Sequence, residues 1–435
     1  MSDMTHRYPD ELAIEPLRQQ PNSVVHVPGS KSITNRGFVL AALADPRQGT
    51  ELRGILRSED TEVMVDGLRA LGFRVDVDWE NSRAWVCRGN SSRIIPAEEA
   101  DLFVANSGTS MRFLTALASL GQGRYRLDGV TRMRERPIED LLSALQRLGV
   151  NAQSELGNGL PPVILETQGW NGREVAIRGD VSSQFLSGLL MAAPLSRDGL
   201  AVRVEGTLVS KPYVAMTVAM MRQFGVEVET DLATYFHVPA VPFYSTLSYD
   251  VEPDASAASY FWGAAAICGG TVSVTGLDNN SLQGDVRFAQ VLKTMGCDLT
   301  VSKVGISVSG RMLRGSMVEM NDISDCVMTL AAVACFAQGP TKIYNVAHIR
   351  HKETDRLAAL TNELRRVGAE VEEFADGLTI TPGPLHGATI ETYNDHRMAM
   401  SMALIGLRVP GIVIRNPGCV AKTYPDFFDD LKRLG

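Results

Sequence analysis

The hydrophobic and polar positions of the chain repeat with a long period. A short amphipathic stretch ending in an apolar residue and a glycine is followed by alternating apolar and polar residues, and this arrangement returns at intervals of roughly 67 to 77 residues. The first part predicts a helix, the glycine suits the position just past its end, and the alternation predicts a strand. The glycines are Gly72, Gly149, Gly225, Gly296, Gly368 and Gly435.

A second element, a helix that is apolar on most of its surface, recurs in phase with the first. Each copy begins with small or acidic polar residues that suit an N-cap, and then continues through Ala, Leu and Met. Helices of this kind are expected to lie in the core. The copies occupy residues 28–44, 106–119, 179–194, 253–268, 324–337 and 394–407.

The two helices and their strands make an α/β unit of about 70 residues, and three units make a domain. The last unit lacks its final strand, whereas residues 12–16 read as a strand without a neighbour, so we expect the N-terminus to complete the sixth unit. This predicts one domain from residues 1–28 with 252–435, and a second from residues 29–251. The polar helix starts should line a cleft between the domains, where they favour anions.

Composition and charge exclude several classes of protein. The chain has 435 residues, 45% of them hydrophobic, and a formal net charge of −8, which argues against a protein that coats nucleic acid. No stretch predicts a signal peptide or a membrane span, so we expect a cytoplasmic protein. The six cysteines and seven histidines lack the spacing of metal ligands or of a disulfide framework, and we expect no metal.

Four motifs in the first half of the chain are rich in small residues, hydroxyls or cations. They are PGSKSITNR at 28–36, NSGTSMR at 106–112, RMRERP at 132–137 and DVSSQF at 180–185. Backbone N–H groups, hydroxyls and fixed cations bind phosphate or carboxylate at such places. Each motif alone could be a capped helix or a solvated loop, but their recurrence in phase favours binding.

In the second half of the chain, acidic residues join the cations. Asp325 precedes a buried helix, KETDR at 352–356 opens an amphipathic one, and NDHR at 394–397 opens the last buried one. Asp325 and Asp395 could be plain N-caps. A solvent-exposed helix face is a poor explanation for the charged residues Lys352, Glu353, Arg356 and Arg397 taken together. Lys422 lies in a turn before a short amphipathic helix. Carboxylates among cations indicate acid/base chemistry on an anionic substrate.

These motifs, in this order, resemble the enolpyruvyl transferase family, and within it the branch that uses shikimate-3-phosphate as acceptor. The segments that carry the resemblance cover nearly the whole chain: PGSKSITNR, NSGTSMR, RMRERPI, DVSSQFL, SKPY, DASAASYF, KETDRL, YNDHRMAM and AKTYPDFF. The resemblance implies an α/β fold of two similar domains, each of three βαβαββ units forming an inside-out α/β barrel, which close over an active-site cleft. The repeats counted above agree with it.

The resemblance also implies the reaction. The enolpyruvyl group of phosphoenolpyruvate would be transferred to the 5-hydroxyl of shikimate-3-phosphate, with release of phosphate, by addition and elimination through a tetrahedral intermediate in the shikimate pathway. The implied catalytic residues are Lys31, Asp325 and Glu353, and which of them moves which proton stays open. No cofactor is implied. We expect a monomer that binds small molecules, with glyphosate as an inhibitor.

Carried over position by position, the resemblance implies two sets of binding residues. Phosphoenolpyruvate would contact Lys31, Gly108, Arg132, Gln184, Arg356, Arg397 and Lys422. Shikimate-3-phosphate would contact Ser32, Arg36, Ser182, Ser183, Gln184, Ser210, Tyr213, Asp325 and Lys352. Supporting positions are His348, Asn106 and His396.

Two positions depart from the pattern of the family. His348 stands where Asn is common, four residues before the lysine of KETDR, and Phe113 stands where Pro commonly follows the NAGTAMR motif. Gly108 leaves room beside the phosphoenolpyruvate site, as in glyphosate-sensitive members. Inhibition by glyphosate is therefore expected, although Phe113 could alter the fit of the inhibitor.

Two other functions compete with this interpretation. The sister enzyme that transfers enolpyruvate to UDP-N-acetylglucosamine shares the architecture, but it usually has a reactive cysteine in the loop matched by residues 132–137, which contain none here. A non-catalytic scaffold that grips nucleic acid would spread cations over an exposed face without acids among them. Here Asp325, Glu353 and Asp395 stand in register with the cations.

Overall fold

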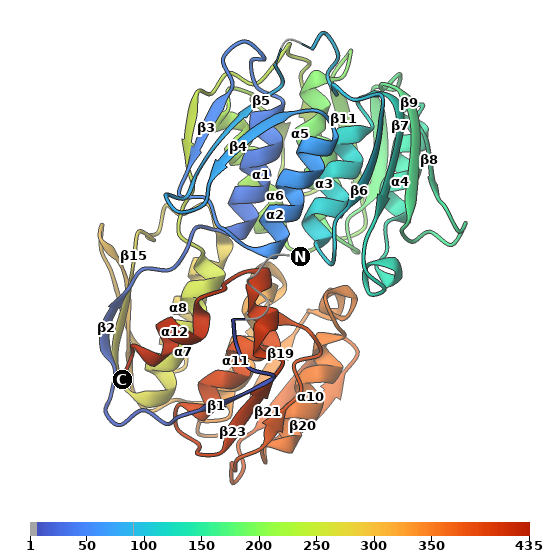
Figure 1. Cartoon of the computed structure of the whole chain (residues 1–435). Coiled ribbons are helices and arrows are strands. Elements are labelled where there is room, and N and C mark those ends of the chain that lie inside the picture. The colour runs from blue at the N-terminus through green and yellow to red at the C-terminus, as the bar shows by residue number, and fades with distance from the viewer. Residues whose placement is uncertain (1–6, 90) are drawn as a thin grey trace. The chain divides into compact units, whose positions relative to one another are not determined.

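The computed structural model describes residues 7–89 and 91–435, and the chain forms two compact units (Figure 1). The inserted unit is Gly29–Val251, and the terminal unit combines the residues up to Pro28 with Glu252–Gly435. Each unit has its own buried core. The chain passes from one unit to the other at Pro28 and again after Val251.

The inserted unit packs long helices against small sheets. Its helices are α1 (Lys31–Ala42), α2 (Glu59–Ala70), α3 (Gly108–Ala118), α4 (Glu139–Arg147), α5 (Ser183–Ala192) and α6 (Lys211–Gln223). Its strands are β3 (Thr50–Arg53), β4 (Arg74–Asp78), β5 (Arg83–Cys87), β6 (Glu99–Phe103), β7 (Gln122–Asp128), β8 (Asn151–Ser154), β9 (Val163–Gln168), β10 (Glu174–Arg178), β11 (Leu200–Glu205), β12 (Glu229–Thr230), β13 (Tyr235–Val238) and β14 (Ser248–Asp250). The sheet orders are β14-β3-β5-β4, β6-β7-β9-β8 and β10-β11-β13-β12.

The terminal unit follows the same plan. Its helices are α7 (Ala255–Cys268), α8 (Phe288–Thr294), α9 (Val327–Ala334), α10 (Arg356–Arg366), α11 (His396–Gly406) and α12 (Phe427–Lys432). Its strands are β1 (Glu11–Ile14), β2 (Asn22–Val25), β15 (Gly270–Thr275), β16 (Asp298–Val301), β17 (Gly305–Gly310), β18 (Met317–Glu319), β19 (Thr341–Tyr344), β20 (Glu370–Phe374), β21 (Gly377–Thr381), β22 (Thr389–Ile390) and β23 (Ile412–Arg415). The sheet orders are β16-β17-β15-β2, β18-β19-β21-β20 and β1-β23-β22.

The predicted βαβαββ repeat is confirmed in the strand pairing. In the second repeat, β6 pairs in parallel with β7 across α3, and β7 and β8 both pair antiparallel with β9 after α4. The third repeat repeats this order from β10 to β13. A parallel pair needs a crossover helix, whereas an antiparallel pair needs only a short turn, so one buried and one amphipathic helix suffice for each sheet.

Strand β1, near the N-terminus, completes the sixth sheet, as the sequence predicts. β1 pairs antiparallel with β23, with Leu12 opposite Ile414. The strand that precedes each passage between the units pairs with a strand of the unit that the chain is leaving. β2 pairs in parallel with β15, and β14 pairs in parallel with β3, so each passage begins only after a strand has been fixed in its sheet.

Polar caps start five of the six predicted buried helices, and the sixth differs. Side chains of Ser30, Ser107, Ser182, Asp254 and Asp395 accept from backbone N–H groups at the starts of α1, α3, α5, α7 and α11. At α9, the N-cap position is held by Cys326, the last residue of the 3₁₀ helix η5 (Asn321–Cys326). Interpreting Asp325 as a plain N-cap is therefore wrong, because its carboxylate contacts side-chain cations instead.

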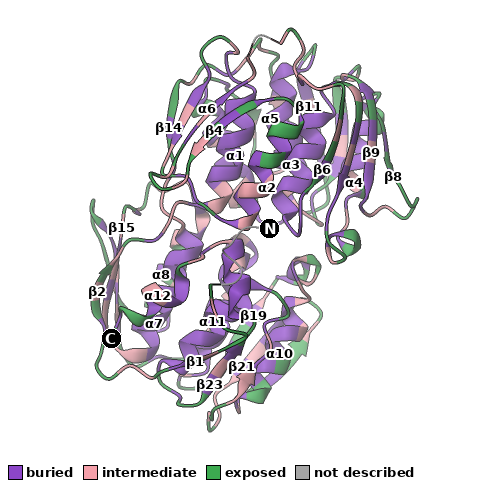
Figure 2. Cartoon of the chain, in the orientation of Figure 1, coloured by how far each residue is buried: buried purple, intermediate pink, exposed green. Residues whose placement is uncertain are grey.

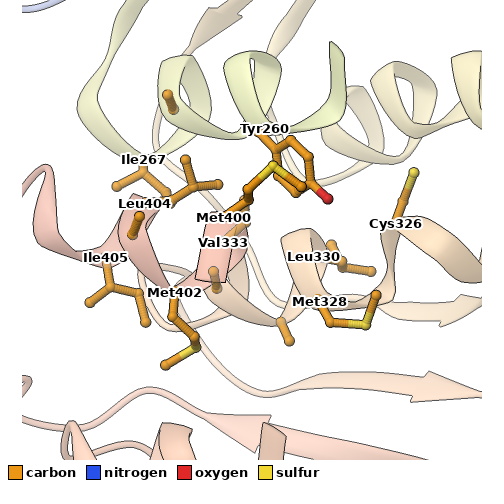
Figure 3. Close-up of a cluster of buried hydrophobic side chains, with 14 of the residues drawn as sticks. Tyr260, Ile267, Cys326, Met328, Leu330, Val333, Met400, Met402, Leu404 and Ile405 are labelled. Carbon is orange, nitrogen blue, oxygen red and sulfur yellow. The ribbon is translucent and has the colours of Figure 1, made fainter. Parts of the chain in front are cut away.

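The buried helices form the core, as expected (Figure 2). In the terminal unit, α7, α9 and α11 pack against one another, and Figure 3 shows their apolar side chains together. Met328, Leu330, Met402 and Leu404 are fully buried there. Burying about 100 Å² of such surface stabilises a fold by roughly 2.5 kcal/mol, so this contact holds the helix starts firmly in place. Within the described chain, every helix is too short or too polar to cross a membrane.

The glycines of the repeat end the amphipathic helices in a left-handed conformation. The φ angles of Gly72, Gly149, Gly225, Gly296 and Gly368 are 88°, 88°, 89°, 118° and 98°. At Gly368 a side chain would also meet neighbours, because an added Cβ would lie 3.1 Å from His386 Cδ2 and 3.3 Å from the backbone carbon of Pro384. Conformation and space therefore both require glycine at this helix end.

We predict that Gly368→Ala destabilises the protein more than Gly339→Ala. Gly339 also has a positive φ, of 85°, but an added Cβ there would meet no described atom within 4 Å. Gly339→Ala, the control, should lower the free energy of unfolding by about 1–2 kcal/mol, because alanine is strained at a positive φ. Gly368→Ala should lower it by about 3 kcal/mol, because the new Cβ also crowds its neighbours. Urea unfolding of both variants measures the difference. Equal losses would contradict the steric part of the argument.

Candidate functional site

In the inserted unit, the first turns of α1 and α2 hold an ion pair. Lys31 Nζ lies 3.1 Å from a carboxylate oxygen of Asp60, and the two side chains are only 11% and 2% exposed. Ser30 caps α1 by accepting from the N–H of Ile33, which fixes where Lys31 leaves the helix. Asp60 therefore orients the ammonium group of Lys31.

The starts of α3 and α5 join this pair through hydrogen bonds. The hydroxyl of Ser110 donates to the carbonyl of Asp60 at 3.3 Å, which links α3 to α2. The side-chain amide of Gln184 donates to Thr109 Oγ1 at 3.3 Å, which links α5 to α3. These contacts run from helix start to helix start. The positive N-terminal ends of four helices of one unit are thus brought together, with the ammonium of Lys31 among them.

Gly108, the first residue of α3, lies against two buried arginines. Arg136 Nη1 donates to the backbone and side-chain oxygens of Asn106 at 3.0 and 3.3 Å. Arg112 Nη1 donates to the carbonyl of Gly108 at 3.3 Å. A Cβ at Gly108 would lie 2.9 Å from Cζ of Arg136, so a side chain here would have to displace a guanidinium.

The three arginines of RMRERP have different surroundings. Arg132, which the resemblance selects, has a side chain 32% exposed and pairs with Glu135 of its own turn at 2.7 Å. Arg134 pairs with Asp128 at 2.7 Å. Arg136 is 4% exposed and contacts the start of α3. The motif therefore contributes a buried cation, Arg136, that the sequence pattern did not distinguish from its neighbours.

Arg36 lies where α1 meets α6. Its Nε donates to Thr217 Oγ1 at 2.7 Å, and its terminal nitrogens donate to the carbonyls of Ser32 at 2.9 Å and Tyr213 at 3.1 Å. The guanidinium carbon lies 5.1 Å from the ring centre of Phe113, within cation–π range. Burial lowers the pKa of Arg36 to about 10, so the group stays charged at neutral pH. Phe113, the departure from the family pattern, thus packs on Arg36, a candidate binding residue for shikimate-3-phosphate.

The predicted serines stand at the starts of α5 and α6. Ser182 caps α5 by accepting from the N–H of Gln184 at 3.2 Å, and Ser183 is the first residue of that helix. Ser210 precedes α6 in a left-handed conformation with φ 52°. Such conformations in residues other than glycine are unfavourable and concentrate at functional sites. Hydroxyls, amides and cations at these helix starts suit an anionic ligand that also carries hydroxyl groups.

In the terminal unit, the carboxylate of Asp325 is a meeting point for three cations. One oxygen lies 3.3 Å from Lys352 Nζ and 3.4 Å from Arg356 Nη1, and the other lies 2.8 Å from Arg397 Nη2. The cations come from separate segments: the end of 3₁₀ helix η6 (Ala347–His351), α10 and α11. Asp325 thereby joins the starts of α9, α10 and α11.

Arg356 is the most enclosed cation of the terminal unit's site, with a side chain 1% exposed. It contacts Asp395 at 2.8 Å and Glu353 at 2.7 Å in addition to Asp325. Burial opposes its charge, but the three carboxylates outweigh burial and raise the pKa of Arg356 above its usual value. The N–H of Arg397 also donates to Asp395 at 2.9 Å, so Asp395 both caps α11 and anchors Arg356.

His348 and Lys352 belong to the same cluster. Burial lowers the pKa of Lys352, although the carboxylate of Asp325 opposes this effect. Burial, and then the charge of Lys352, lower the pKa of His348 to about 3. His348 is therefore a neutral imidazole at physiological pH. It can donate or accept a hydrogen bond, as the Asn common at this position in the family could.

Tyr260, His396 and Lys422 belong to elements that adjoin this cluster. Arg397 Nη1 donates to the hydroxyl of Tyr260 at 3.2 Å. Lys422 ends the 3₁₀ helix η7 (Pro417–Lys422), which packs on α11, and it is 4% exposed. His396 is fully buried beside Asp395, with its Nδ1 3.7 Å from the carboxylate. Three predicted cations of the second half, Lys352, Arg356 and Arg397, thus meet at Asp325, and Lys422 is buried on a segment that packs on α11.

Four functional candidates were not selected from the sequence: Asp60, Arg136, Tyr260 and Asp285. Asp285 accepts from the hydroxyl of Ser256, and burial, followed by the charge of Asp325, raises its pKa to about 6. Asp60, Tyr260 and Asp285 looked like ordinary helix-start or core residues, and Arg136 could not be told from the other arginines of its motif, because the partner of each is distant in the chain. Among the described residues, no group of three or more His, Cys, Asp or Glu side chains could hold a metal ion.

The sequence and the fold match one family over nearly their whole length. The profile of the EPSP synthase family, described as EPSP synthase (3-phosphoshikimate 1-carboxyvinyltransferase), matches residues 17–431. The 3-phosphoshikimate 1-carboxyvinyltransferase of Nostoc punctiforme is 48% identical over 96% of this chain and 98% of its own, and that of Shewanella oneidensis is 46% identical over the same shares. The EPSP synthase structure from Acinetobacter baumannii has a TM-score of 0.80 and 26% identity, over 98% of both chains.

We predict that His348→Gln reduces the acid sensitivity of the fold. The pKa of His348 is about 3 in the folded protein and about 6.5 in an unfolded chain. The unfolded state therefore binds more protons between these values, so this contribution to stability is intact above pH 6.5 and is lost as the pH falls towards 3. From pH 7 to 5, the variant should lose about 2 kcal/mol less unfolding free energy.

Urea unfolding at the two pH values measures this difference. The exposed His386 supplies the matched control, and His386→Gln should follow the original protein. Parallel pH profiles for His348→Gln and the original protein would contradict the assignment of a buried neutral imidazole.

Proposed function

The chain belongs to the EPSP synthase family, and we propose that its two clusters of helix starts supply a single active site for phosphoenolpyruvate and shikimate-3-phosphate. The enzyme transfers the enolpyruvyl group in the shikimate pathway as a 3-phosphoshikimate 1-carboxyvinyltransferase. The observation that carries the site assignment is the contact of Asp325 with Lys352, Arg356 and Arg397, because it places the cations of three segments around one carboxylate.

Phosphoenolpyruvate carries a phosphate and a carboxylate, and its proposed ligands are cations and helix-start amides. In the terminal unit they are Arg356, Arg397 and Lys422, and in the inserted unit Lys31, Gly108, Arg132 and Gln184. Since Arg356 and Arg397 already satisfy carboxylates of the protein, their charges are held in fixed directions before substrate arrives. Fixed cations stabilise the negative charge that develops on the departing phosphate without having to reorganise.

Shikimate-3-phosphate is the proposed ligand of the hydroxyl-rich helix starts. Ser182, Ser183 and Ser210 would donate to its phosphate with Arg36 as counter-charge, while Ser32, Gln184 and Tyr213 complete the inserted-unit part. Asp325 and Lys352 would face its 5-hydroxyl from the terminal unit. Arg36 supports this role through its fixed orientation between α1 and α6. His348, Asn106 and His396 are proposed as supporting residues.

The proposed chemistry moves two protons. The 5-hydroxyl oxygen forms a bond to C2 of phosphoenolpyruvate and loses its proton, while C3 gains one, which gives a tetrahedral adduct. Loss of a proton from C3 then expels inorganic phosphate and leaves the enol ether. Asp325, which contacts three cations, is the proposed base, whereas Glu353 and Lys31 are the candidates for proton exchange at C3.

Closure of the two units around the substrates belongs to the same proposal. Exclusion of water would strengthen each charged contact and hold the reacting atoms together. We propose a cytoplasmic monomer that needs no cofactor for this chemistry. The transfer to UDP-N-acetylglucosamine is not favoured, because relatives named for the shikimate enzyme match nearly the full chain.

We predict that the purified protein releases phosphate from phosphoenolpyruvate with shikimate-3-phosphate, and not with UDP-N-acetylglucosamine. Lys31→Ala should abolish turnover, and Glu353→Gln should reduce kcat by roughly 10²–10⁴-fold with substrate binding retained, as expected for loss of a proton-transfer group. The exposed Lys303 and Glu372 provide matched controls, and Lys303→Ala and Glu372→Gln should keep full activity. Near-original turnover in both site variants would overturn the assignment.

We propose further that glyphosate, which carries a phosphonate and a carboxylate, competes with phosphoenolpyruvate. Its inhibition constant should lie at or below the KM for phosphoenolpyruvate. Gly108→Ala should raise that constant, because the new Cβ would lie 2.9 Å from Cζ of Arg136 and 3.1 Å from Nη1 of Arg112 and must displace a guanidinium. Steady-state inhibition with Gly157→Ala as control measures this. A constant far above KM in the original enzyme would refute it.

A further inference from the structure

The turn that leads into α11 has an unfavourable backbone conformation. Tyr393 and Asn394 have φ angles of 54° and 52°, and the N–H of Asp395 donates to the carbonyl of Thr392 at 2.8 Å. Two successive positive φ angles inside a hydrogen-bonded turn are typical of type I′, which strongly prefers Gly, Asn or Asp. A tyrosine at the first of these positions is strained, so its surroundings must hold it there.

The buried carboxylate of Glu363, on α10, holds this turn. Its side chain is 0% exposed, and it accepts from the hydroxyl of Tyr393 at 2.8 Å and from the N–H of Glu391 at 3.1 Å. Arg366 of the same helix pairs with it at 3.0 Å. A carboxylate this deeply buried requires such donors to replace its hydration. Since two of the donors come from the segment before α11, Glu363 joins α10 to that segment.

The same turn is joined to the segment that leads to Lys422. The side-chain amide of Asn416 donates to the side-chain oxygen of Asn394 at 3.1 Å, and Arg415 pairs with Glu391. Asn416 is itself left-handed, with φ 50°, and it immediately precedes η7, which ends at Lys422. Two strained segments are therefore fastened to each other by their side chains.

The elements connected in this way carry the cations of the terminal unit. Arg356 begins α10, Arg397 lies in the first turn of α11, and Lys422 ends η7. We propose that a turn network fixes these three cations relative to one another and so sets the affinity for phosphoenolpyruvate, an inference that rests on the function proposed above. The members of the turn network are Glu363, Tyr393, Asn394 and Asn416. They act as positioning residues through the elements that they join.

The choice of residues in the turn supports this role. Glycine at position 393 would remove the strain, but it would also remove the hydroxyl that reaches Glu363. A strained backbone conformation persists where the surrounding contacts hold it in place, and such conformations concentrate at functional sites. A small anion bound by several cations is sensitive to their spacing, because a displacement of about 1 Å can reduce activity by roughly 10²-fold.

The experiment compares two variants that each lose one tyrosine hydroxyl. Tyr393→Phe removes the bond to Glu363 and keeps the ring. Tyr125→Phe, in the inserted unit, removes an equally short bond of 2.8 Å to the carbonyl of Ala97. We expect Tyr393→Phe to raise the KM for phosphoenolpyruvate roughly 3- to 10-fold, in keeping with loss of a hydrogen bond to a charged group, and the KM for shikimate-3-phosphate less than about twofold. Tyr125→Phe should leave both constants unchanged.

A third variant, Arg397→Gln, separates this inference from the proposed site. If Arg397→Gln raises the KM for phosphoenolpyruvate and Tyr393→Phe does not, the turn network is overturned and the site assignment stands. If Arg397→Gln leaves that KM unchanged, the proposed site is wrong, and the inference falls with it. Equal effects of Tyr393→Phe and Tyr125→Phe, or equal increases in both KM values, would show general loosening and would also overturn the network.

Discussion

The carboxylate of Asp325 and the three cations around it are the interaction on which the terminal unit depends. Asp325 accepts from Lys352, Arg356 and Arg397, so the starts of α9, α10 and α11 meet at one group. Buried charges are tolerated only when partners compensate for their lost hydration, and the site achieves this by alternating acids with bases. The cations needed for an anionic substrate can therefore be buried before that substrate arrives.

The repeat explains why charge gathers at the helix starts in both units. Each of the six repeats places one buried helix with its polar N-terminal end beyond the apolar core. This end carries partial positive charge whatever the side chains are. The two units then differ in chemistry. Hydroxyls, amides and Lys31 surround the helix starts of the inserted unit, whereas carboxylates paired with arginines surround those of the terminal unit.

Backbone strain marks the same regions independently of charge. Of the eight described residues other than glycine that have a positive φ, six lie just before or within a segment that carries a proposed binding residue: Ala105, Ser210, Asn345, Tyr393, Asn394 and Asn416. The other two, Ser82 and Leu232, lie outside these segments. Local propensity alone would not select these conformations, so tertiary contacts must hold them. In the terminal unit, the packing of α7, α9 and α11 supports the contacts that hold Asn345, Tyr393 and Asn416.

The sequence determined the repeat, the buried helices, the closure of the last sheet by the N-terminal strand and the motifs of the site, because periodicity, capping and helix-end glycines are local properties that neighbouring residues encode. Tertiary structure decided which charges meet. Lys31 pairs with Asp60, and Arg136 rather than Arg132 packs on Gly108. The carboxylate of Asp325 contacts three cations and does not cap α9. These choices depend on the desolvation and mutual distance of residues far apart in the chain, which no local pattern contains.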